Sequence, residues 1–273
     1  MLPRAGRGAT VAGMLRGLFL PIFDELADPG LVARLAAEAE AAGWDGVFVW
    51  DHVAYRAPVR SLADPWVTLA AIACATERVR LGPMVTPLPR RRPVKLAREV
   101  ATLDRLSGGR LVLGVGIGGD GSGELSATGE QLDDRVRGAM LDEGLAVLRA
   151  AWTGEPVEHR GEHYVVDGLT VLPTPVQPAG PPVWVAARWG NPAPLRRAAR
   201  HDGVFPIGIE EPAQLAELVA TVGRGAGFDV AVGGPPGADE TGYAQAGATW
   251  WMTSFPITTT EADVRAVLRD GPA

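Results

Sequence analysis

Asp51 and His52 are the residues best suited to chemistry, because they directly follow "DGVFVW", an apolar run with the composition of a buried strand. A histidine titrates near neutrality and can act as an acid, a base or a hydrogen-bond donor. Polar residues that end a buried strand are costly unless they face a polar site. His52 is therefore either a catalytic residue or a structural histidine paired with Asp51, and these residues alone favour neither interpretation.

A glycine-rich run, "LVLGVGIGGDGSGEL", follows another apolar segment. Gly114, Gly116 and Gly119 satisfy G-x-G-x-x-G, but a Rossmann fingerprint leads directly into a helix. Here no helical pattern begins before Asp133. The sequence therefore disfavours a Rossmann turn and predicts that these glycines let a flat ligand approach the backbone. A flexible loop that merely tolerates glycine is the alternative.

The segment "RWGNPAP" has the composition of an anion-binding turn before a helix. Asn191 can cap that helix and Pro192 suits its first position. The backbone N–H groups of Trp189, Gly190 and Asn191 would face the anion, and Arg188 would add charge. Ordinary helix capping is the alternative interpretation.

Tryptophans recur near the ends of the apolar runs, at Trp50, Trp189 and Trp250. Tryptophan is rarely fully buried and often lines ligand sites, so we expect these three to border the substrate. The alternative is ordinary packing in the core.

Strand-like and helix-like segments alternate along the chain. Strands are expected at 15–22, 45–50, 79–85, 110–115, 183–187, 204–207, 229–232 and 248–252. Helices are expected at 28–44, 65–75, 93–106, 133–152, 192–200, 212–222, 238–246 (a short helix or loop) and 260–268. Eight such units predict an α/β fold, a (β/α)8 TIM barrel, and an open doubly wound sheet is the rival. The run "PVEHRGEHYVVDGLTVLPTPVQP" predicts a hairpin insertion between strands four and five. In a barrel the chemistry lies at the carboxyl ends of the strands.

Bulk composition excludes several classes of protein. The 273 residues carry a net charge of −6, which disfavours a nucleic-acid partner. No apolar run approaches the ~20 residues of a membrane span. The lone cysteine, Cys74, rules out an internal disulfide framework and is expected to be buried in a helix. His159 and His163 lie in the expected hairpin rather than on a helix, so no metal site is expected. We expect a cytoplasmic protein in which 1–13 is a disordered or mis-started leader and 14–273 is a single domain.

Several longer stretches resemble a known family. The most specific is "RVRLGPMVTPLPRRRPVKLAREVATLDRLSGGRLVLGVGIG", supported by "GWDGVFVWDHV", "ELSATGE" and "PVWVAARWGNPAPLRRAARHDGVF". From about residue 15 to residue 209 the chain is similar to the luciferase-like family of flavin- and deazaflavin-dependent oxidoreductases, which are (β/α)8 barrels.

The resemblance implies roles for residues at the strand ends. Asp51 and His52 match an Asp-His pair that lies against the cofactor ring, with the histidine as acid, base or orienting group. The resemblance therefore implies that His52 is a catalytic residue and that Asp51 orients it. A non-proline cis peptide that bulges behind the ring would fall at Met84-Val85.

Two further segments match parts of the family that hold the cofactor. The glycine loop, with Gly116 and Gly118, would flank the ring. Trp189, Gly190 and Asn191 match the phosphate-binding turn of the family.

The cofactor implied is coenzyme F420, with FMN as the alternative. The expected reaction is hydride transfer to or from a small organic substrate that is apolar or uncharged. The run Arg90–Arg92 is expected to meet the acidic tail of F420. Asp120 or Glu124 would replace a glutamate that some relatives carry directly after these glycines. The lysines that bind sugar phosphate in those relatives have no clear match, so that substrate is not expected.

The resemblance is also compatible with two other functions. One is an FMN-dependent monooxygenase that uses O2 and reduced FMN from a partner flavin reductase. The other is a non-catalytic flavin-binding barrel. Relatives are commonly dimers, so a homodimer is expected.

Overall fold

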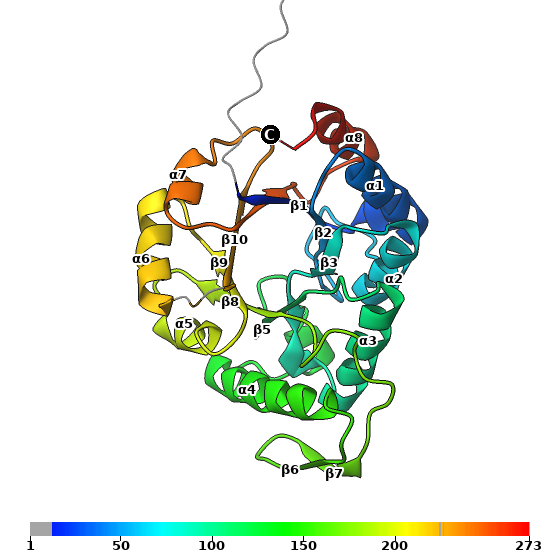
Figure 1. Cartoon of the computed structure of the whole chain (residues 1–273), viewed down its shortest axis with the longest axis vertical. Coiled ribbons are helices and arrows are strands. Elements are labelled where there is room, and N and C mark those ends of the chain that lie inside the picture. Colours follow the sequence, from blue (N-terminus) through cyan, green and yellow to red (C-terminus); the bar gives the residue numbers. More distant parts are fainter. Residues whose placement is uncertain (1–12, 224, 226, 273) are drawn as a thin grey trace, which may run out of the picture.

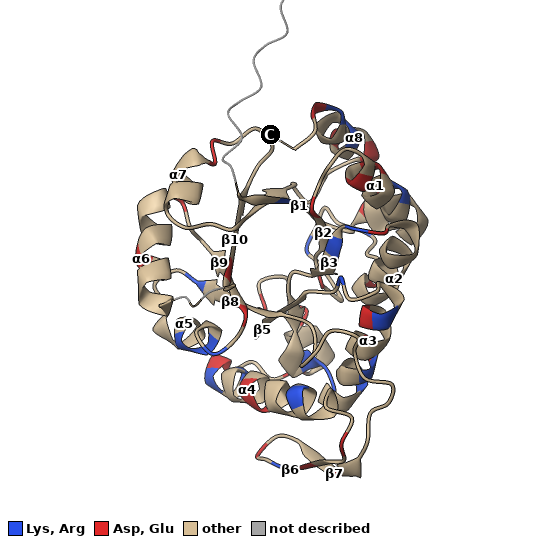
Figure 2. Cartoon of the chain, viewed as in Figure 1, with Lys and Arg blue, Asp and Glu red and all other residues tan. Residues whose placement is uncertain are grey.

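The computed structural model describes residues 13–223, 225 and 227–272. The expected leader, 1–13, lies outside the described residues except for Gly13. Within the described part, helices surround a ring of strands (Figure 1). Charged residues of both signs gather on outer helices such as α4 (Asp134–Ala151) and α8 (Glu261–Asp270) (Figure 2).

Parallel strands form the ring in the order β3-β2-β1-β11-β10-β9-β8-β5-β4. Their bounds are β1 Leu15–Leu20, β2 Gly46–Val49, β3 Arg80–Pro83, β4 Thr86–Pro87, β5 Leu113–Gly116, β8 Val183–Arg188, β9 Gly203–Ile207, β10 Asp229–Gly234 and β11 Trp250–Ser254. A parallel bridge between Leu81 and Leu111 joins the two ends of the sheet. β3 and β4 are two pieces of the third predicted strand, so the (β/α)8 barrel is confirmed.

Several of the helices begin at a residue whose side chain caps them. Besides α4 and α8 the helices are α1 Pro29–Ala41, α2 Pro65–Ala75, α3 Pro93–Leu106, α5 Pro192–Ala198, α6 Pro212–Val222 and α7 Thr241–Gln245, with 3-10 turns η1 Asp24–Ala27, η2 Leu88–Arg90 and η3 Ser126–Thr128. The carboxylate of Asp64 accepts from the Val67 N–H at the start of α2, and Asp133 caps α4 in the same way. None of the described helices is long and apolar enough to cross a membrane.

The hairpin insertion is confirmed as an antiparallel pair, β6 (Val157–Arg160) and β7 (Val165–Leu169). It lies beside α4 (Figure 1). Glu143 on α4 bonds Nε2 of His159 at 2.9 Å and accepts from the backbone N–H of His163 and Tyr164. One carboxylate on α4 therefore fixes the tip of the hairpin.

The inside of the barrel is filled by a cluster of its own, which comprises Phe48, Met84, Val112, Trp184, Ala231, Trp250 and Met252. The expectation that Trp250 borders the substrate is wrong. Trp250 begins β11 in register with Leu15, the first residue of β1, and therefore lies at the amino end of the barrel. Its ring packs 5.7 Å from Phe48 and 5.6 Å from Trp184, and it is 2% exposed.

The expected burial of Cys74 is also wrong, because this residue is exposed on α2. The helix "PWVTLAAIACA" is apolar on every face, so its composition could not indicate which side meets the barrel.

Candidate active site

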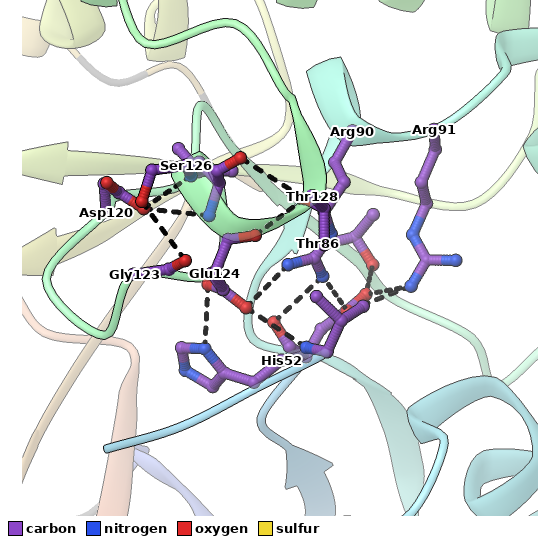
Figure 3. A network of polar contacts seen from close by, with 12 residues as sticks. His52, Thr86, Arg90, Arg91, Asp120, Gly123, Glu124, Ser126 and Thr128 are labelled. Carbon is purple, nitrogen blue, oxygen red and sulfur yellow. Dashed lines mark hydrogen bonds and ion pairs between the residues drawn. The ribbon is translucent and has the colours of Figure 1, made fainter.

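His52 projects from the carboxyl end of β2 and meets a carboxylate from the glycine-rich loop (Figure 3). Its Nδ1 lies 3.0 Å from Oε1 of Glu124. The other oxygen of Glu124 accepts from the Val53 N–H at 3.1 Å and from Nη1 of Arg90 at 2.7 Å. The orienting partner of His52 is therefore Glu124, and the expectation that Asp51 orients His52 is wrong.

Asp51 instead anchors two arginines behind the site. Its carboxylate accepts from Nη2 of Arg90 at 2.8 Å, from Nη2 of Arg91 at 2.7 Å and from the hydroxyl of Thr86 at 2.8 Å. The side chain of Asp51 is 0% exposed. It can neither touch a substrate nor contact a cofactor ring, which corrects both roles expected of this side chain.

Arg90 and Arg91 are largely buried in these ion pairs, at 6% and 19% exposed. The network contains two guanidinium groups, of Arg90 and Arg91, and two carboxylates, of Asp51 and Glu124, so their charges cancel. The expectation that Arg90–Arg92 meet an acidic cofactor tail is therefore wrong for the first two arginines. Arg92 is exposed at the start of α3.

The loop that delivers Glu124 is built by its own hydrogen bonds. Oδ1 of Asp120 accepts from the backbone N–H groups of Leu125 and Ser126, at 2.8 and 3.0 Å. The Thr128 hydroxyl donates to the carbonyl of Glu124 at 2.7 Å. Of the two acids proposed to replace the family glutamate, Glu124 thus reaches His52, and Asp120 shapes the turn (Figure 3).

The surroundings of Glu124 keep it ionised. Burial favours its neutral form, but hydrogen bonds from His52 and from the Val53 N–H, with the charge of Arg90, outweigh burial and hold the pKa of Glu124 below its ordinary value. A carboxylate beside Nδ1 favours a proton on that nitrogen. Nε2 of His52 is then left to exchange a proton with a ligand.

The lowered pKa of Glu124 predicts how folding stability depends on pH. A carboxyl whose pKa is lower in the folded chain stabilises the fold above its unfolded pKa, and this contribution is lost as the pH falls through the folded pKa. We expect the difference in unfolding free energy between the wild type and Glu124→Gln to be constant near neutrality and to shrink below about pH 4.5. Urea titrations between about pH 3 and pH 7 measure this difference. A difference that stays constant throughout contradicts the assignment.

The glycines of β5 lie against the chain segment between β3 and β4. The Met84–Val85 peptide is cis, as the resemblance implies. A Cβ on Gly114 would lie 2.3 Å from the Pro83 carbonyl oxygen, and one on Gly116 would lie 2.9 Å from Val85. Gly114 and Gly116 therefore make room for the neighbouring chain, rather than only for a ligand.

Gly114→Ala is expected to destabilise the barrel, because its Cβ would collide with backbone atoms that cannot move without shifting a strand. Overpacking of this kind costs about 1–3 kcal/mol. Gly119→Ala is the matched control, since nothing lies within 4 Å of its Cβ. Thermal unfolding of both variants measures the effect, and equal melting temperatures would contradict it.

The turn expected to bind an anion is partly occupied by internal hydrogen bonds. The Trp189 N–H donates to the Ile207 carbonyl and the Asn191 N–H to the Arg188 carbonyl, at 2.9 and 3.1 Å. The Asn191 side chain caps α5. Two of the three backbone N–H groups expected to face an anion therefore donate to carbonyl groups of the chain, and only the Gly190 N–H is left to bind one. The indole of Trp189 packs against the cluster between sheet and helices, which places it away from the barrel interior.

Trp50 lies beside His52, with ring centroids 5.9 Å apart. Its indole N–H is buried and has no acceptor among the described residues.

The residues that the structure describes contain no group of three or more His, Cys, Asp or Glu side chains placed to hold a metal ion.

A TIM barrel with an acid–base residue at the carboxyl ends of its strands is the architecture of an enzyme. The family model of the luciferase-like monooxygenases matches residues 14–263. The chain therefore belongs to this family.

Individual relatives are similar to part or most of the chain. An F420-dependent glucose-6-phosphate dehydrogenase of Kineococcus radiotolerans is 36% identical over 179 residues, which are 63% of this chain and 50% of that protein. The chain thus spans about half the length of this curated relative. An F420-dependent secondary alcohol dehydrogenase in complex with an F420–acetone adduct superposes with a TM-score of 0.77 at 19% identity, covering 93% of this chain and 96% of that one. A monooxygenase from Streptomyces bottropensis superposes with a TM-score of 0.72 at 23% identity, covering 94% and 98%. These two structures share the barrel fold.

Proposed function

We propose that this chain is a coenzyme F420-dependent oxidoreductase that transfers a hydride between the cofactor and a small organic substrate. The observation that carries the proposal is the contact between His52 and an ionised Glu124 at the carboxyl ends of the strands. The F420-dependent relative of 36% identity supports the choice of cofactor.

The residues at the mouth of the barrel fit such a cofactor. The buried Trp50 indole N–H can donate to a ring carbonyl. Gly118 and Gly119 begin the loop above the strand ends, with nothing within 4 Å of a Cβ on Gly119. The exposed Arg188 and the Gly190 N–H are the groups proposed to hold the phosphate. When bound, F420 supplies a carbon centre that accepts or returns a hydride in one two-electron step.

Residues of the chain itself, His52 and its partner Glu124, carry out the proton transfer. Nε2 of His52 accepts the hydroxyl proton of an alcohol that is being oxidised, and it returns a proton to the carbonyl in the reverse direction. Glu124 holds the ring by Nδ1 and stabilises the imidazolium that forms. Hydrogen bonds from His52 and from the Val53 N–H, with the charge of Arg90, hold the pKa of Glu124 below its ordinary value, so the carboxylate is a poor proton acceptor.

Titration of the cofactor-free protein with oxidised F420 and with FMN, by fluorescence and equilibrium dialysis, tests the proposal. We expect F420 to bind at least about tenfold more tightly than FMN, a difference of about 1.4 kcal/mol. Preference for FMN overturns the proposal. It would favour a monooxygenase supplied by a flavin reductase, which the fold shared with the S. bottropensis enzyme allows and which oxygen uptake would reveal. Retained binding with no turnover would favour a non-catalytic barrel.

The proposal includes a homodimer. The outward face of α2 carries Val67, Cys74 and Ala75 exposed, and the helix has no charged residue. An apolar surface helix of this kind is typical of a subunit contact. Light scattering gives the mass in solution, and slow alkylation of Cys74 that quickens on dilution is the expected result. A monomeric mass with fast alkylation at every concentration contradicts the dimer.

A cytoplasmic location is also part of the proposal, and the single cysteine of the chain supports it.

A further inference from the structure

Asp24, in the segment that follows β1, has an unusual backbone conformation. Its φ of 47° lies in the left-handed region, which residues other than glycine rarely adopt and which Asp and Asn tolerate best. Asp24 is exposed, so packing in the core does not force this conformation on it. Strained residues persist only where their surroundings hold them, and they cluster at functional sites. The groups that hold Asp24 belong to a different loop.

The Asp24 carboxylate binds the backbone of the β2–α2 loop, which comprises residues 50–64. Its Oδ1 accepts from the N–H groups of Arg60 and Ser61, at 2.9 and 3.1 Å. The Asp24 N–H donates to the Ser61 carbonyl at 2.9 Å. Hydrogen bonds from the Arg60 N–H and from Ser61 hold the pKa of Asp24 below its ordinary value, so the acceptor is a charged carboxylate at neutral pH. Asp24 therefore fixes the β2–α2 loop to the segment after β1.

Tyr55 lies in the part of the β2–α2 loop that is held from both sides. Before Tyr55, the Val53 N–H donates to Glu124 at 3.1 Å. After Tyr55, the loop is held by Asp24. The Tyr55 ring lies 4.8 Å from the imidazole of His52 between ring centroids, with an interplanar angle of 79°, which is a favourable edge-to-face contact. The position of the loop therefore decides whether this ring contacts His52.

Phe23 joins Asp24 to the same aromatic group. Phe23 directly precedes Asp24, is 2% exposed and forms an antiparallel bridge with Leu62. Its ring lies 4.9 Å from Tyr55 and 6.0 Å from His52 between ring centroids. Movement of the chain at Asp24 would therefore shift the support on which Tyr55 rests.

We infer that Asp24 is a positioning residue for His52. It fixes the β2–α2 loop so that Tyr55, packed on Phe23, restricts the rotation of the imidazole, while Glu124 holds its Nδ1. Without the Asp24 carboxylate the loop is free to move, and the imidazole samples orientations in which Nε2 no longer faces the ligand. The expected effect on turnover rests on the proposed function.

Proton NMR of the cofactor-free chain tests this inference. The chain has four histidines, and a His52→Gln variant assigns the His52 signals. Asp24→Gly loses the carboxylate, but glycine suits the left-handed φ, so the variant is expected to fold. We expect its His52 signals to lose the ring-current shift from Tyr55, and kcat for F420 reduction to fall about tenfold. Asp24→Asn keeps an acceptor oxygen and tolerates the same φ, so both values are expected to recover.

Asp28→Ala is the matched control. Asp28 is also exposed, and its Oδ1 accepts from the backbone N–H of Gly30 at 2.8 Å, but this bond caps α1 and does not touch the β2–α2 loop. Its His52 signals and kcat should equal those of the wild type. Tyr55→Leu completes a double-mutant cycle with Asp24→Gly. Because Asp24 acts through Tyr55, adding Asp24→Gly to Tyr55→Leu is expected to change kcat by less than about twofold, and a tenfold loss in both backgrounds contradicts this.

Two further results would overturn the inference. One is an Asp24→Gly variant that folds and retains either the wild-type His52 signals or the wild-type kcat. The other needs no variant: rapid exchange of the Arg60 and Ser61 amide hydrogens in the wild type would show that Asp24 does not hold the loop. If F420 does not bind to the wild type, the proposed function fails. The NMR and exchange measurements use no cofactor, so they still decide the role of Asp24.

Discussion

Glu124→Gln is expected to lower kcat by about 100-fold, the range in which general acid–base catalysis contributes, while KM for the alcohol changes little. In the wild type, one carboxylate oxygen of Glu124 faces Nδ1 of His52 and the other accepts from Val53 and Arg90. A glutamine has a single acceptor oxygen, so either His52 or the pair of donors faces its NH2 group. The proton on Nδ1 is then no longer held, and Nε2 is no longer kept as the base.

The matched control is Glu143→Gln, because Glu143 bonds His159 at 2.9 Å in the same manner but holds the hairpin. Its kcat should equal that of the wild type. A second measurement needs no cofactor: nitrogen NMR of the four histidines reports the position of each imidazole proton. We expect Nδ1–H for His52 in the wild type and a mixture of tautomers in Glu124→Gln. Unchanged kcat together with an unchanged His52 tautomer would show that Glu124 does not position this histidine.

Asp51→Ala is expected to lower the free energy of unfolding by about 3–5 kcal/mol, the usual cost of removing one partner of a buried ion pair. Asp51 is 0% exposed and receives hydrogen bonds from Arg90, Arg91 and Thr86. Without Asp51, the guanidinium of Arg90 still pairs with Glu124, whereas that of Arg91 has lost its carboxylate partner. The segment from β4 to η2 would also lose its tie to the end of β2.

Urea denaturation measures this loss. Asp167→Asn is the control, because Asp167 pairs with Arg160 on the hairpin where both side chains are 70% exposed. Exposed pairs contribute little, so its unfolding midpoint should match that of the wild type. If Asp51→Ala unfolds no earlier than Asp167→Asn, the network does not stabilise the mouth of the barrel.

Much of the barrel could be predicted because its local signals agree with its tertiary structure. The predicted bounds of α2, α3 and α6 coincide with the observed ones. Each of these helices starts with proline, whose fixed φ and missing N–H suit that position. The hairpin was recognisable because alternation of period two replaced the helical period.

The partner of His52 could not be predicted from neighbouring residues. Successive side chains in an extended segment point to opposite sides, so Asp51 and His52 diverge, and Asp51 turns away toward Arg90 and Arg91. Glu124 is 72 residues from His52 and arrives on an irregular loop. Its position depends on turn geometry set by Asp120, which no periodic pattern encodes.

The error at Trp250 has a different cause. The last strand was expected at 248–252, whereas β11 is Trp250–Ser254. A shift of two residues keeps the same side chains facing inward but moves each along the barrel axis. Trp250 therefore sits at the amino end rather than near the mouth, where Ser254 ends the strand.

The balanced charges of Asp51, Arg90, Arg91 and Glu124 constrain how this sequence can change. Replacing any one of these four residues with an uncharged residue leaves a buried charge without its partner, whereas replacing two residues of opposite charge together preserves neutrality. Among homologous chains we expect Arg90 and Glu124 to be exchanged or lost together, and Arg91 to vary with Asp51. The four positions would then vary together in evolution. Loss of Glu124, the partner of His52, would require a second substitution at Arg90.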